Sequence, residues 1–262
     1  MPSLERCALL GHGHNNHVYY SRVHTVRTMF FVKDNLHLKL LKARAVSDIF
    51  LMKQIVMCAA PVSVWVWRYL SGCVCMIYMI RHGKTDKNTA NVLQGRSDIP
   101  LNGLGIKEAE DAAKKLSGIH FFKVFSSPLI RAVDTARIVA PGTAPVIDPR
   151  LIEMDYGPYE GVGLLDPPKE LMDFFADFAN NPAPSGMESL DSVVRRLGEF
   201  LEEIKTLPGN ILISTHAIAL KGALEYLTPA SNGSFWGKYI GNCDIYVANN
   251  HDGIIDIPYK MP

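Results

Sequence analysis

The sequence predicts an α/β fold whose sheet is mostly parallel and covered by helices on both faces. Two observations carry this prediction. From Met76 onward, short apolar runs alternate with amphipathic stretches of helical periodicity. The first run, "MIYMI" at 76–80, has no polar alternation, as is typical of a strand that is buried on both faces. Strands that alternate with helices favour a parallel sheet with helices packed on either side.

The elements of the first half follow the opening strand in order. Residues 101–118 have a helical pattern that ends at Gly118. The apolar stripe of this predicted helix is formed by Leu104, Ala109, Ala112, Ala113 and Leu116. A strand is predicted over 121–127. A helix is predicted over 127–140, with Ser127 as its N-cap and Pro128 at its first helical position.

The second half continues the alternation. A third strand is predicted over 144–148, and a helix begins with a capping-box pattern from Ser185 to Glu188. The apolar face of that helix is formed by Val193, Leu197, Phe200, Leu201 and Ile204. A strand over 210–215 is followed at once by His216 and by the helical stretch "AIALKGALEYL". Strands over 244–250 and 253–257 close the chain.

The first 75 residues differ in composition from the rest. They contain nine Lys or Arg and three acids, whereas the remaining 187 residues contain 18 Lys or Arg and 23 acids. Four of the five cysteines also lie in this segment. We therefore expect residues 1–75 to be an extension outside the catalytic fold, and residues 76–262 to form the catalytic domain.

Two features of the extension bear on a possible metal site and on a possible membrane span. Three histidines in "GHGHNNHVYY" fit no standard zinc spacing, so no metal site is predicted. The apolar run over 55–67 has 13 residues, fewer than the roughly 20 that a membrane span needs, so no membrane partner is expected. The net charge of +1 gives no indication of a nucleic-acid partner. The number of cysteines is odd and their spacing is irregular, which favours a reducing compartment, and we expect a cytoplasmic protein.

Basic side chains gather where three predicted strands end. Arg81 and His82 follow the first strand, Arg131 lies in the first turn of the helix after the second, and His216 follows the strand over 210–215. Ligands of such sheets bind at the carboxyl ends of the strands. Two arginines, two histidines and two helix starts at one sheet edge indicate an anion site, and forked guanidinium groups suit a phosphate.

Two histidines beside a phosphate suggest covalent chemistry, because imidazole can attack phosphorus and hold the phosphoryl group. The arginines would neutralise the transferring oxygens. A proton donor is still required, and Glu153, Asp155 and Glu160 are all candidates in "RLIEMDYGPYEG". Periodicity does not choose among these three.

The residues around these positions resemble the sequence blocks of the histidine phosphatase superfamily, the phosphoglycerate-mutase-like fold. The blocks, in the family's order, are "IRHGKTDKN", "LQGRSDIPLNGLG", "SSPLIRAVDTA", "LIEMDYGPYEG", "GMESLDSVVRRL" and "ISTHAIALKGAL". The resemblance covers about residues 76–250. It implies a three-layer α/β/α sandwich with a mostly parallel central sheet. Ala217, where many members have Gly, and Pro158 depart from the pattern and bear on pocket shape.

The resemblance also implies roles for individual residues. His82 would be the nucleophile, and Glu153, rather than Asp155 or Glu160, would be the acid and base. The phosphate and the substrate would be held by Arg81, Asn88, Gln94, Gly95, Arg131 and His216. No cofactor is implied, and a homodimer is compatible with the sequence.

The short segment between Gly163 and Ser185 favours a phosphatase over a mutase. The resemblance implies that cofactor-dependent phosphoglycerate mutases carry a long insertion there, and an open lid lets water reach a phosphohistidine. The chain is similar to compact bacterial enzymes of the α-ribazole phosphatase and broad-specificity phosphatase type. A small phosphorylated metabolite is the expected substrate. The alternatives are a phosphoglycerate-mutase-type transferase and a non-catalytic phosphate-binding protein on the same fold.

Four further basic residues could contact an anionic substrate, but each is interpreted as an ordinary surface residue. They are Lys84, Arg96, Lys221 and Lys238. His120 and His251 have no arginine beside them and are interpreted as structural or surface residues.

Overall fold

The chain divides into two units, Met1–Leu70 and Ser71–Pro262. The structure, a computed structural model, describes residues 5–7, 17–23, 26–32, 75–178 and 180–262. In the first unit, strands β1 (Glu5–Cys7), β2 (His17–Val23) and β3 (Val26–Val32) form an antiparallel sheet in that order. The histidine cluster's side chains and the apolar run 55–67 lie outside the described residues, so those predictions stay open. The boundary at Met76 also stays a prediction.

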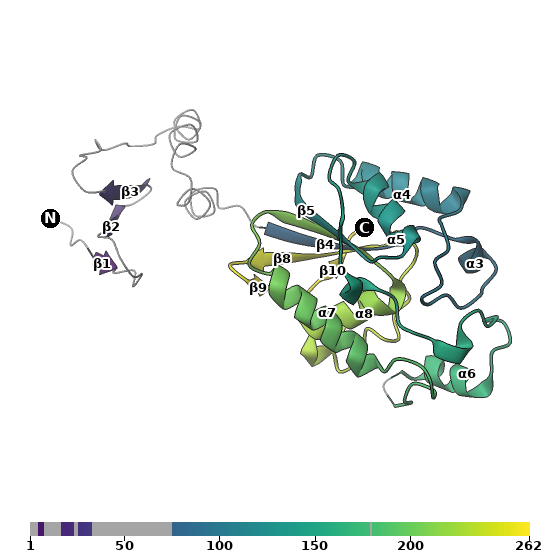
Figure 1. The fold of residues 1–262 in the computed structure, drawn as a ribbon. Coiled ribbons are helices and arrows are strands. Elements are labelled where there is room, and N and C mark those ends of the chain that lie inside the picture. Colours follow the sequence, from purple (N-terminus) through teal and green to yellow (C-terminus); the bar gives the residue numbers. More distant parts are fainter. Residues whose placement is uncertain (1–4, 8–16, 24–25, 33–74, 179) are drawn as a thin grey trace. The chain divides into compact units, whose positions relative to one another are not determined.

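The second unit is built on a seven-stranded sheet (Figure 1) in the order β10-β8-β4-β7-β5-β6, with β9 paired to β8. Its strands are β4 (Cys75–Arg81), β5 (Phe121–Ser126), β6 (Val146–Ile147), β7 (Asn210–Thr215), β8 (Ile245–His251), β9 (Ile254–Ile255) and β10 (Tyr259–Lys260). Strands β4, β7, β5 and β6 pair in parallel, and β8 pairs antiparallel to β4. The predicted mostly parallel sheet is therefore confirmed.

Helices cover both faces of this sheet, which gives the three layers. On one side lie α4 (Gly103–Lys115) and α5 (Ile130–Val139), and on the other lie α7 (Leu190–Ile204) and α8 (Ala217–Leu227). The short helices α3 (Asp86–Thr89) and α6 (Lys169–Ala176) lie on the connections at the carboxyl ends of the parallel strands. Three turns of 3-10 helix, η1 (Pro149–Leu151), η2 (Gly157–Tyr159) and η3 (Pro229–Ser231), complete the elements.

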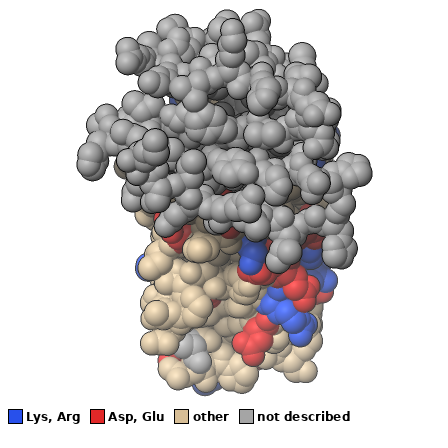
Figure 2. Space-filling model, turned by 90° about the vertical axis from the view of Figure 1, so that its left-hand side faces the viewer, with Lys and Arg blue, Asp and Glu red and all other residues tan. Residues whose placement is uncertain are grey.

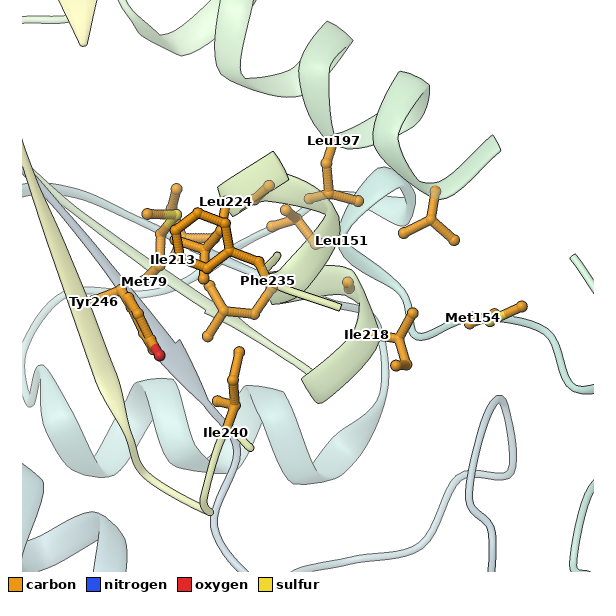
Figure 3. Packing of buried hydrophobic residues seen from close by; sticks show 14 of the residues in the cluster. Met79, Leu151, Met154, Leu197, Ile213, Ile218, Leu224, Phe235, Ile240 and Tyr246 are labelled. Atoms are coloured by element: carbon orange, nitrogen blue, oxygen red, sulfur yellow. The ribbon is translucent and has the colours of Figure 1, made fainter. Parts of the chain in front are cut away.

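Strand β4 shows why the opening run has no alternation. Ile77 and Met79 pack into the core on the side of α7 and α8, while Tyr78 and Ile80 pack into the core on the side of α4 and α5. All four side chains are buried. Figure 3 shows Met79 close to core side chains of the α7 and α8 layer. A central strand whose side chains pack into a core on each face of the sheet must be apolar at every position.

Three predicted element boundaries are wrong. Helix α5 begins at Ile130 after Leu129, and the hydroxyl of Ser127 accepts a hydrogen bond from the Leu129 N–H in the turn before it. Helix α7 is capped by Ser189, because Glu188 is occupied by arginine contacts. The third strand, β6, is only two residues long, since it is an edge strand with exposed side chains.

One predicted core position is also wrong. Leu104, in the first turn of α4, is 57% exposed. Ala109, Ala112 and Leu116 of the predicted stripe are buried as expected.

Charge is mixed on the visible surface. Figure 2 shows basic and acidic side chains side by side on one face, with no wide field of one sign. Among the described residues, no helix has the length and apolar character that crossing a membrane would take.

Candidate active site

His82 lies directly after β4, at the carboxyl end of the parallel strands. Its backbone N–H donates to Thr215 O at 2.9 Å, and its carbonyl accepts from Asn242 Nδ2 at 3.0 Å. The ring is 4% exposed. Nδ1 lies 2.7 Å from Gly83 O, and Arg131 Nε donates to Nε2 at 3.3 Å. A carbonyl only accepts, so Nδ1 carries the hydrogen and Nε2 presents its lone pair.

The surroundings of His82 keep its imidazole neutral. Burial lowers its pKa well below the ordinary value, and the positive charges of Arg131 and Arg81 lower the pKa further. The bond to Gly83 O acts in the opposite direction but does not prevail. A neutral ring that is unprotonated at Nε2 is the nucleophilic form of histidine, and attack on phosphorus would require the Arg131 Nε hydrogen bond to Nε2 to be given up.

Two glycines let the backbone after His82 lie against the start of α4. A Cβ on Gly83 would be 2.4 Å from Gly105 O, and a Cβ on Gly105 would be 2.0 Å from Lys84 O. Thr135 of α5 fixes the same turn, because its hydroxyl accepts from the Gly83 N–H at 3.0 Å. The position of the His82 ring is thus determined by packing with α4 and α5.

Arg131 is fully buried at the start of α5. Its NH1 and NH2 donate to Ser97 O at 2.7 Å and Gly95 O at 2.6 Å. Burial lowers its pKa to about 10, so it remains a cation at neutral pH. The predicted residue Gly95 therefore contributes a carbonyl that orients this arginine.

His216 is the N-cap residue of α8, and its ring centroid lies 5.1 Å from that of His82. Ser127 Oγ lies 2.7 Å from His216 Nε2, and this hydroxyl already accepts from the Leu129 N–H. A hydroxyl can donate or accept in this contact; we assign it as the donor to Nε2, which places the hydrogen of the neutral ring on Nδ1. Burial, with Arg131 as the next cause, lowers the pKa of His216 well below the ordinary value.

Three donor groups among these residues are buried without a hydrogen-bond partner in the described part of the chain. They are Arg81 Nε, Gln94 Nε2 and His216 Nδ1. Arg81 is anchored by NH1, which donates to Ile240 O at 2.5 Å, and Gln94 is anchored by Oε1, which accepts from Thr85 Oγ1 at 2.6 Å. Buried polar groups are almost always paired, so donors without partners need an explanation. A ligand rich in acceptors, such as a phosphate, would satisfy all three.

Asn88 lies in the short helix α3 and contacts Thr85 and Asn242. Its Oδ1 accepts from Thr85 in the capping box of α3, and Asn242 Nδ2 lies 3.4 Å from it. Asn88 thereby joins the α3 turn to the segment that also contacts the His82 carbonyl.

The three candidate acids are in different surroundings. Glu153 is 4% exposed: its Oε1 accepts from the N–H groups of Met154 and Ala219, and its Oε2 accepts from that of Ile218. Its carboxylate therefore lies at the N-terminus of α8, beside the N-cap His216. Asp155 is half-buried and pairs with Arg96 at 2.9 Å. Glu160 accepts from the N–H groups of Gly95 and Arg96 and from the Ser97 hydroxyl.

These contacts separate Glu153 from its rivals. Glu160 holds the loop that orients Arg131, and Asp155 takes part in a surface ion pair. Glu153 is the buried one of the three, and its charge acts on both Arg131 and Lys221, whereas Glu160 acts on Arg131.

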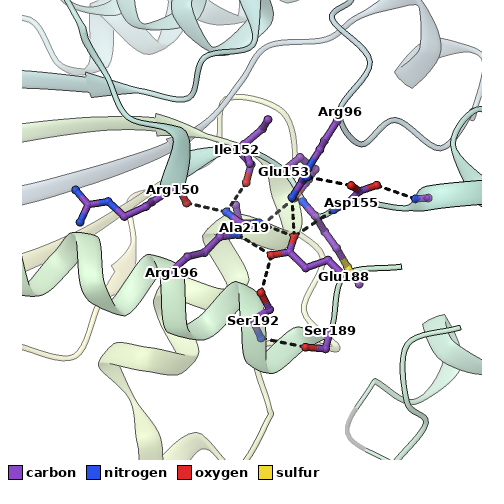
Figure 4. A network of polar contacts seen from close by, with 12 residues as sticks. Arg96, Arg150, Ile152, Glu153, Asp155, Glu188, Ser189, Ser192, Arg196 and Ala219 are labelled. Atoms are coloured by element: carbon purple, nitrogen blue, oxygen red, sulfur yellow. Dashed lines mark hydrogen bonds and ion pairs between the residues drawn. The ribbon is translucent and has the colours of Figure 1, made fainter. Parts of the chain in front are cut away.

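A network of charged groups fixes the segment around Glu153 (Figure 4). Arg196 of α7 donates from NH1 to the carbonyls of Arg150 and Ile152 at 2.7 and 2.6 Å, and pairs through Nε with Glu188 at 2.9 Å. Glu188 also accepts from the Asp155 N–H. The backbone on both sides of Glu153 is therefore clamped to α7.

The structure thus brings together the predicted residues Arg81, His82, Arg131, Glu153 and His216. It corrects one interpretation: Lys221 is 9% exposed, because its side chain lies beneath the segment that contains Trp236. Ser127, Thr135 and Asn242 were missed as supporting residues. Hydroxyl and amide groups next to strand ends were the available signal, but their partners are far away in the sequence.

The chain is similar to proteins that are named as phosphatases and as mutases. A relative from Hydrogenobacter thermophilus, named "Putative phosphoserine phosphatase 2", is 30% identical over 175 residues, which are 64% of this chain and 86% of the relative. A relative from Proteus mirabilis, named "Probable phosphoglycerate mutase GpmB", is 32% identical over 155 residues, which are 55% of this chain and 70% of the relative.

Solved structures show the same fold. A mycobacterial glucosyl-3-phosphoglycerate phosphatase complexed with VO3 aligns with a TM-score of 0.62 and 25% identity, over 71% of this chain and 97% of that one. A phosphoserine phosphatase mutant from Entamoeba histolytica, in complex with phosphoserine, aligns with a TM-score of 0.62 and 23% identity, over 72% and 95% of the two chains.

The family model of the histidine phosphatase superfamily, branch 1, matches residues 77–257. The match runs from within β4 to just beyond β9 and includes all the side chains of the candidate site. It confirms the predicted family and, with it, the predicted class of enzyme, a phosphatase. The chain belongs to branch 1 of the histidine phosphatase superfamily.

Proposed function

We propose that this chain hydrolyses small phosphomonoesters through a phosphohistidine on Nε2 of His82, with Glu153 as acid and base and without a metal ion. The observation that carries the proposal is the fixed tautomer of His82. Nδ1 donates to Gly83 O, so Nε2 is unprotonated in this buried, neutral ring, and its lone pair becomes available once Arg131 Nε, which donates to it here, binds the phosphoryl group instead. Imidazole in that form attacks phosphorus directly.

The donors around His82 would hold the phosphoryl group. Arg131 and Arg81 supply positive charge for its equatorial oxygens, and His216 Nδ1–H and Gln94 Nε2 supply further hydrogen bonds. Such preorganised donors stabilise the charge that develops in phosphoryl transfer, a role that metal ions often have elsewhere. Asn88 and Gly95 contribute through the loops that they hold.

The two steps balance as follows. In the first, the bond from phosphorus to His82 Nε2 forms as the ester P–O bond breaks, and Glu153 gives its proton to the leaving oxygen. Oε2 is the better site for that proton, because it accepts one backbone hydrogen bond whereas Oε1 accepts two. In the second step, the Glu153 carboxylate takes a proton from water as the water oxygen attacks phosphorus and the P–N bond breaks.

Labelling tests the first step. Rapid quenching with a ³²P-labelled phosphomonoester should give a label that is acid-labile and alkali-stable, and His82→Ala should remove both label and turnover. Glu153→Gln should let label accumulate with a nitrophenyl ester, whose leaving group needs little protonation, and should slow alkyl esters far more. Turnover that is lost with a chelator and restored by a divalent ion would contradict the mechanism.

A mutase is the second candidate, because relatives such as the Proteus protein bear that name. The two activities differ in their product. Incubation with 3-phosphoglycerate should release inorganic phosphate, and accumulation of 2-phosphoglycerate without phosphate release would show the mutase instead. A chain that binds phosphate but hydrolyses no ester would support the non-catalytic alternative.

A further inference from the structure

We propose that Lys221 recognises a carboxylate on the leaving group, so that the preferred substrates are phosphomonoesters of hydroxy acids. This inference rests on the proposed function and adds to it the chemical class of the substrate. It starts from an unusual group: a buried lysine that pairs with no carboxylate among the described residues.

Lys221 Nζ makes one hydrogen bond, to Trp236 O at 2.6 Å, and lies 5.1 Å from the centroid of the Phe178 ring. An ammonium group has three N–H donors, so two of them have no protein partner in the described part of the chain. A buried cation is costly unless it is paired. Burial lowers the pKa of Lys221 to about 8, which expresses that cost while leaving the group charged at neutral pH.

The position of Lys221 on α8 places it beside the proposed acid. Glu153 accepts hydrogen bonds from the N–H groups of Ile218 and Ala219, only two and three residues earlier on the same helix. Two or three residues correspond to about 3 to 5 Å along the helix axis. Long helical side chains point back toward the N-terminus of their helix, which for Lys221 is the end of α8 where the Glu153 carboxylate lies. Glu153 and Arg81 are the charged groups that act on it.

The chemistry then decides which part of a substrate meets Lys221. In an in-line displacement the leaving oxygen lies opposite the attacking Nε2 of His82. The acid must reach that oxygen, so Glu153 marks the leaving-group side of the site. A group attached one or two carbons beyond the leaving oxygen would lie next to Glu153, where Lys221 is.

A carboxylate is the group that fits these donors. Lysine is a compact point charge with rotatable donors, whereas a second phosphate is better matched by a forked guanidinium. The Phe178 ring and the buried surroundings strengthen a charge pair there, because screening by water is weak. The substrate's carboxylate would supply the negative partner that the protein itself does not provide.

Matched substrates isolate this interaction. O-phosphoserine and O-phosphoethanolamine differ only in the carboxylate, and 3-phosphoglycerate and glycerol 3-phosphate are a second pair of the same kind. The wild-type chain should have a kcat/KM for each acid at least about tenfold above that for its partner, as expected for one charge-assisted hydrogen bond. Lys221→Met should lower kcat/KM for the acids by about 10- to 100-fold and change the partners by less than about threefold.

Lys238→Met is the control variant, since Lys238 is an exposed lysine on the same segment as Trp236 and also lies over an aromatic ring, that of Phe235 at 4.0 Å. It should leave both members of each pair unchanged. Equal losses for acids and partners in Lys221→Met would show a structural role and overturn the proposal.

Failure of the inference is separable from failure of the proposed function. A wild-type chain that hydrolyses nitrophenyl phosphate but does not prefer the acids refutes the role of Lys221 alone, and this measurement needs no variant. A wild-type chain that hydrolyses none of the esters refutes both.

Discussion

The buried histidine pair predicts a specific loss of stability in mild acid. His82 and His216 are both fully enclosed, and burial together with nearby arginines lowers the pKa of each well below its ordinary value. In the unfolded chain the two rings titrate near the ordinary value of about 6.5. Below that pH the unfolded state binds protons that the folded state does not, so stability falls as pH falls through 6.5.

The magnitude follows from proton linkage. One such histidine costs about 1.4 kcal/mol of unfolding free energy between pH 7.5 and pH 5.5, provided that it stays neutral in the folded state. The two rings together therefore cost about 2.7 kcal/mol over this interval. This is a large part of the 5 to 15 kcal/mol that is usual for a domain.

Urea unfolding, followed by circular dichroism, measures this difference. The wild-type chain and the double variant His82→Gln, His216→Gln are compared at pH 7.5 and at pH 5.5. Carboxylates titrate alike in both chains, so the difference between their pH dependences isolates the rings. Phosphate buffers are excluded, because an anion bound at the site would change the charge around both rings.

The double variant should lose about 2.7 kcal/mol less than the wild type between the two pH values, and each single variant should lose about half of that amount less. Identical pH dependences in all chains would refute the reasoning, since they would show that both imidazoles take up protons in the folded protein.

Two further predictions follow from the contacts of the site. Gly105→Ala should lower the unfolding free energy by about 1 to 3 kcal/mol or more, because its Cβ would be 2.0 Å from Lys84 O. Gly103→Ala is the control: its Cβ would have nothing within 4 Å, so the unfolding free energy should change by less than about 1 kcal/mol. Equal effects of the two variants in thermal unfolding would contradict the close packing of the His82 turn. Glu160→Ala should lower kcat/KM for nitrophenyl phosphate by about 10- to 100-fold, because the variant frees the loop whose carbonyls orient Arg131. Asp155→Asn should change kcat/KM by less than about threefold. A larger loss of kcat/KM in Asp155→Asn than in Glu160→Ala would show that Asp155 acts at the site.

The fold was predictable because its signals are local. A strand that feeds two cores must be apolar throughout, and the run from Met76 to Ile80 shows this directly. Helix α8 was predicted to the residue, since His216 interrupts the apolar pattern at its N-cap. The predicted starts of α5 and α7 are wrong because capping residues that look suitable in the sequence have other partners in the fold. Ser127 and Glu188 have good capping chemistry, but Ser127 is engaged by the distant His216, and Glu188 by the distant Arg96 as well as by Arg196 of α7.

The candidate site was predictable to the level of residue type and sheet edge, but its geometry depends on contacts that span the chain. Arg131 is aimed by the carbonyls of Gly95 and Ser97, and that loop is in turn held by Glu160, 63 residues beyond Ser97. No periodicity relates these segments. The same holds for Glu153, whose selection over Glu160 depends on which carboxylate meets the N-terminus of α8 and which meets the loop. Composition and spacing can therefore assemble the charges of this site, but which carboxylate holds the loop and which lies at the N-terminus of α8 is decided only when the loops pack.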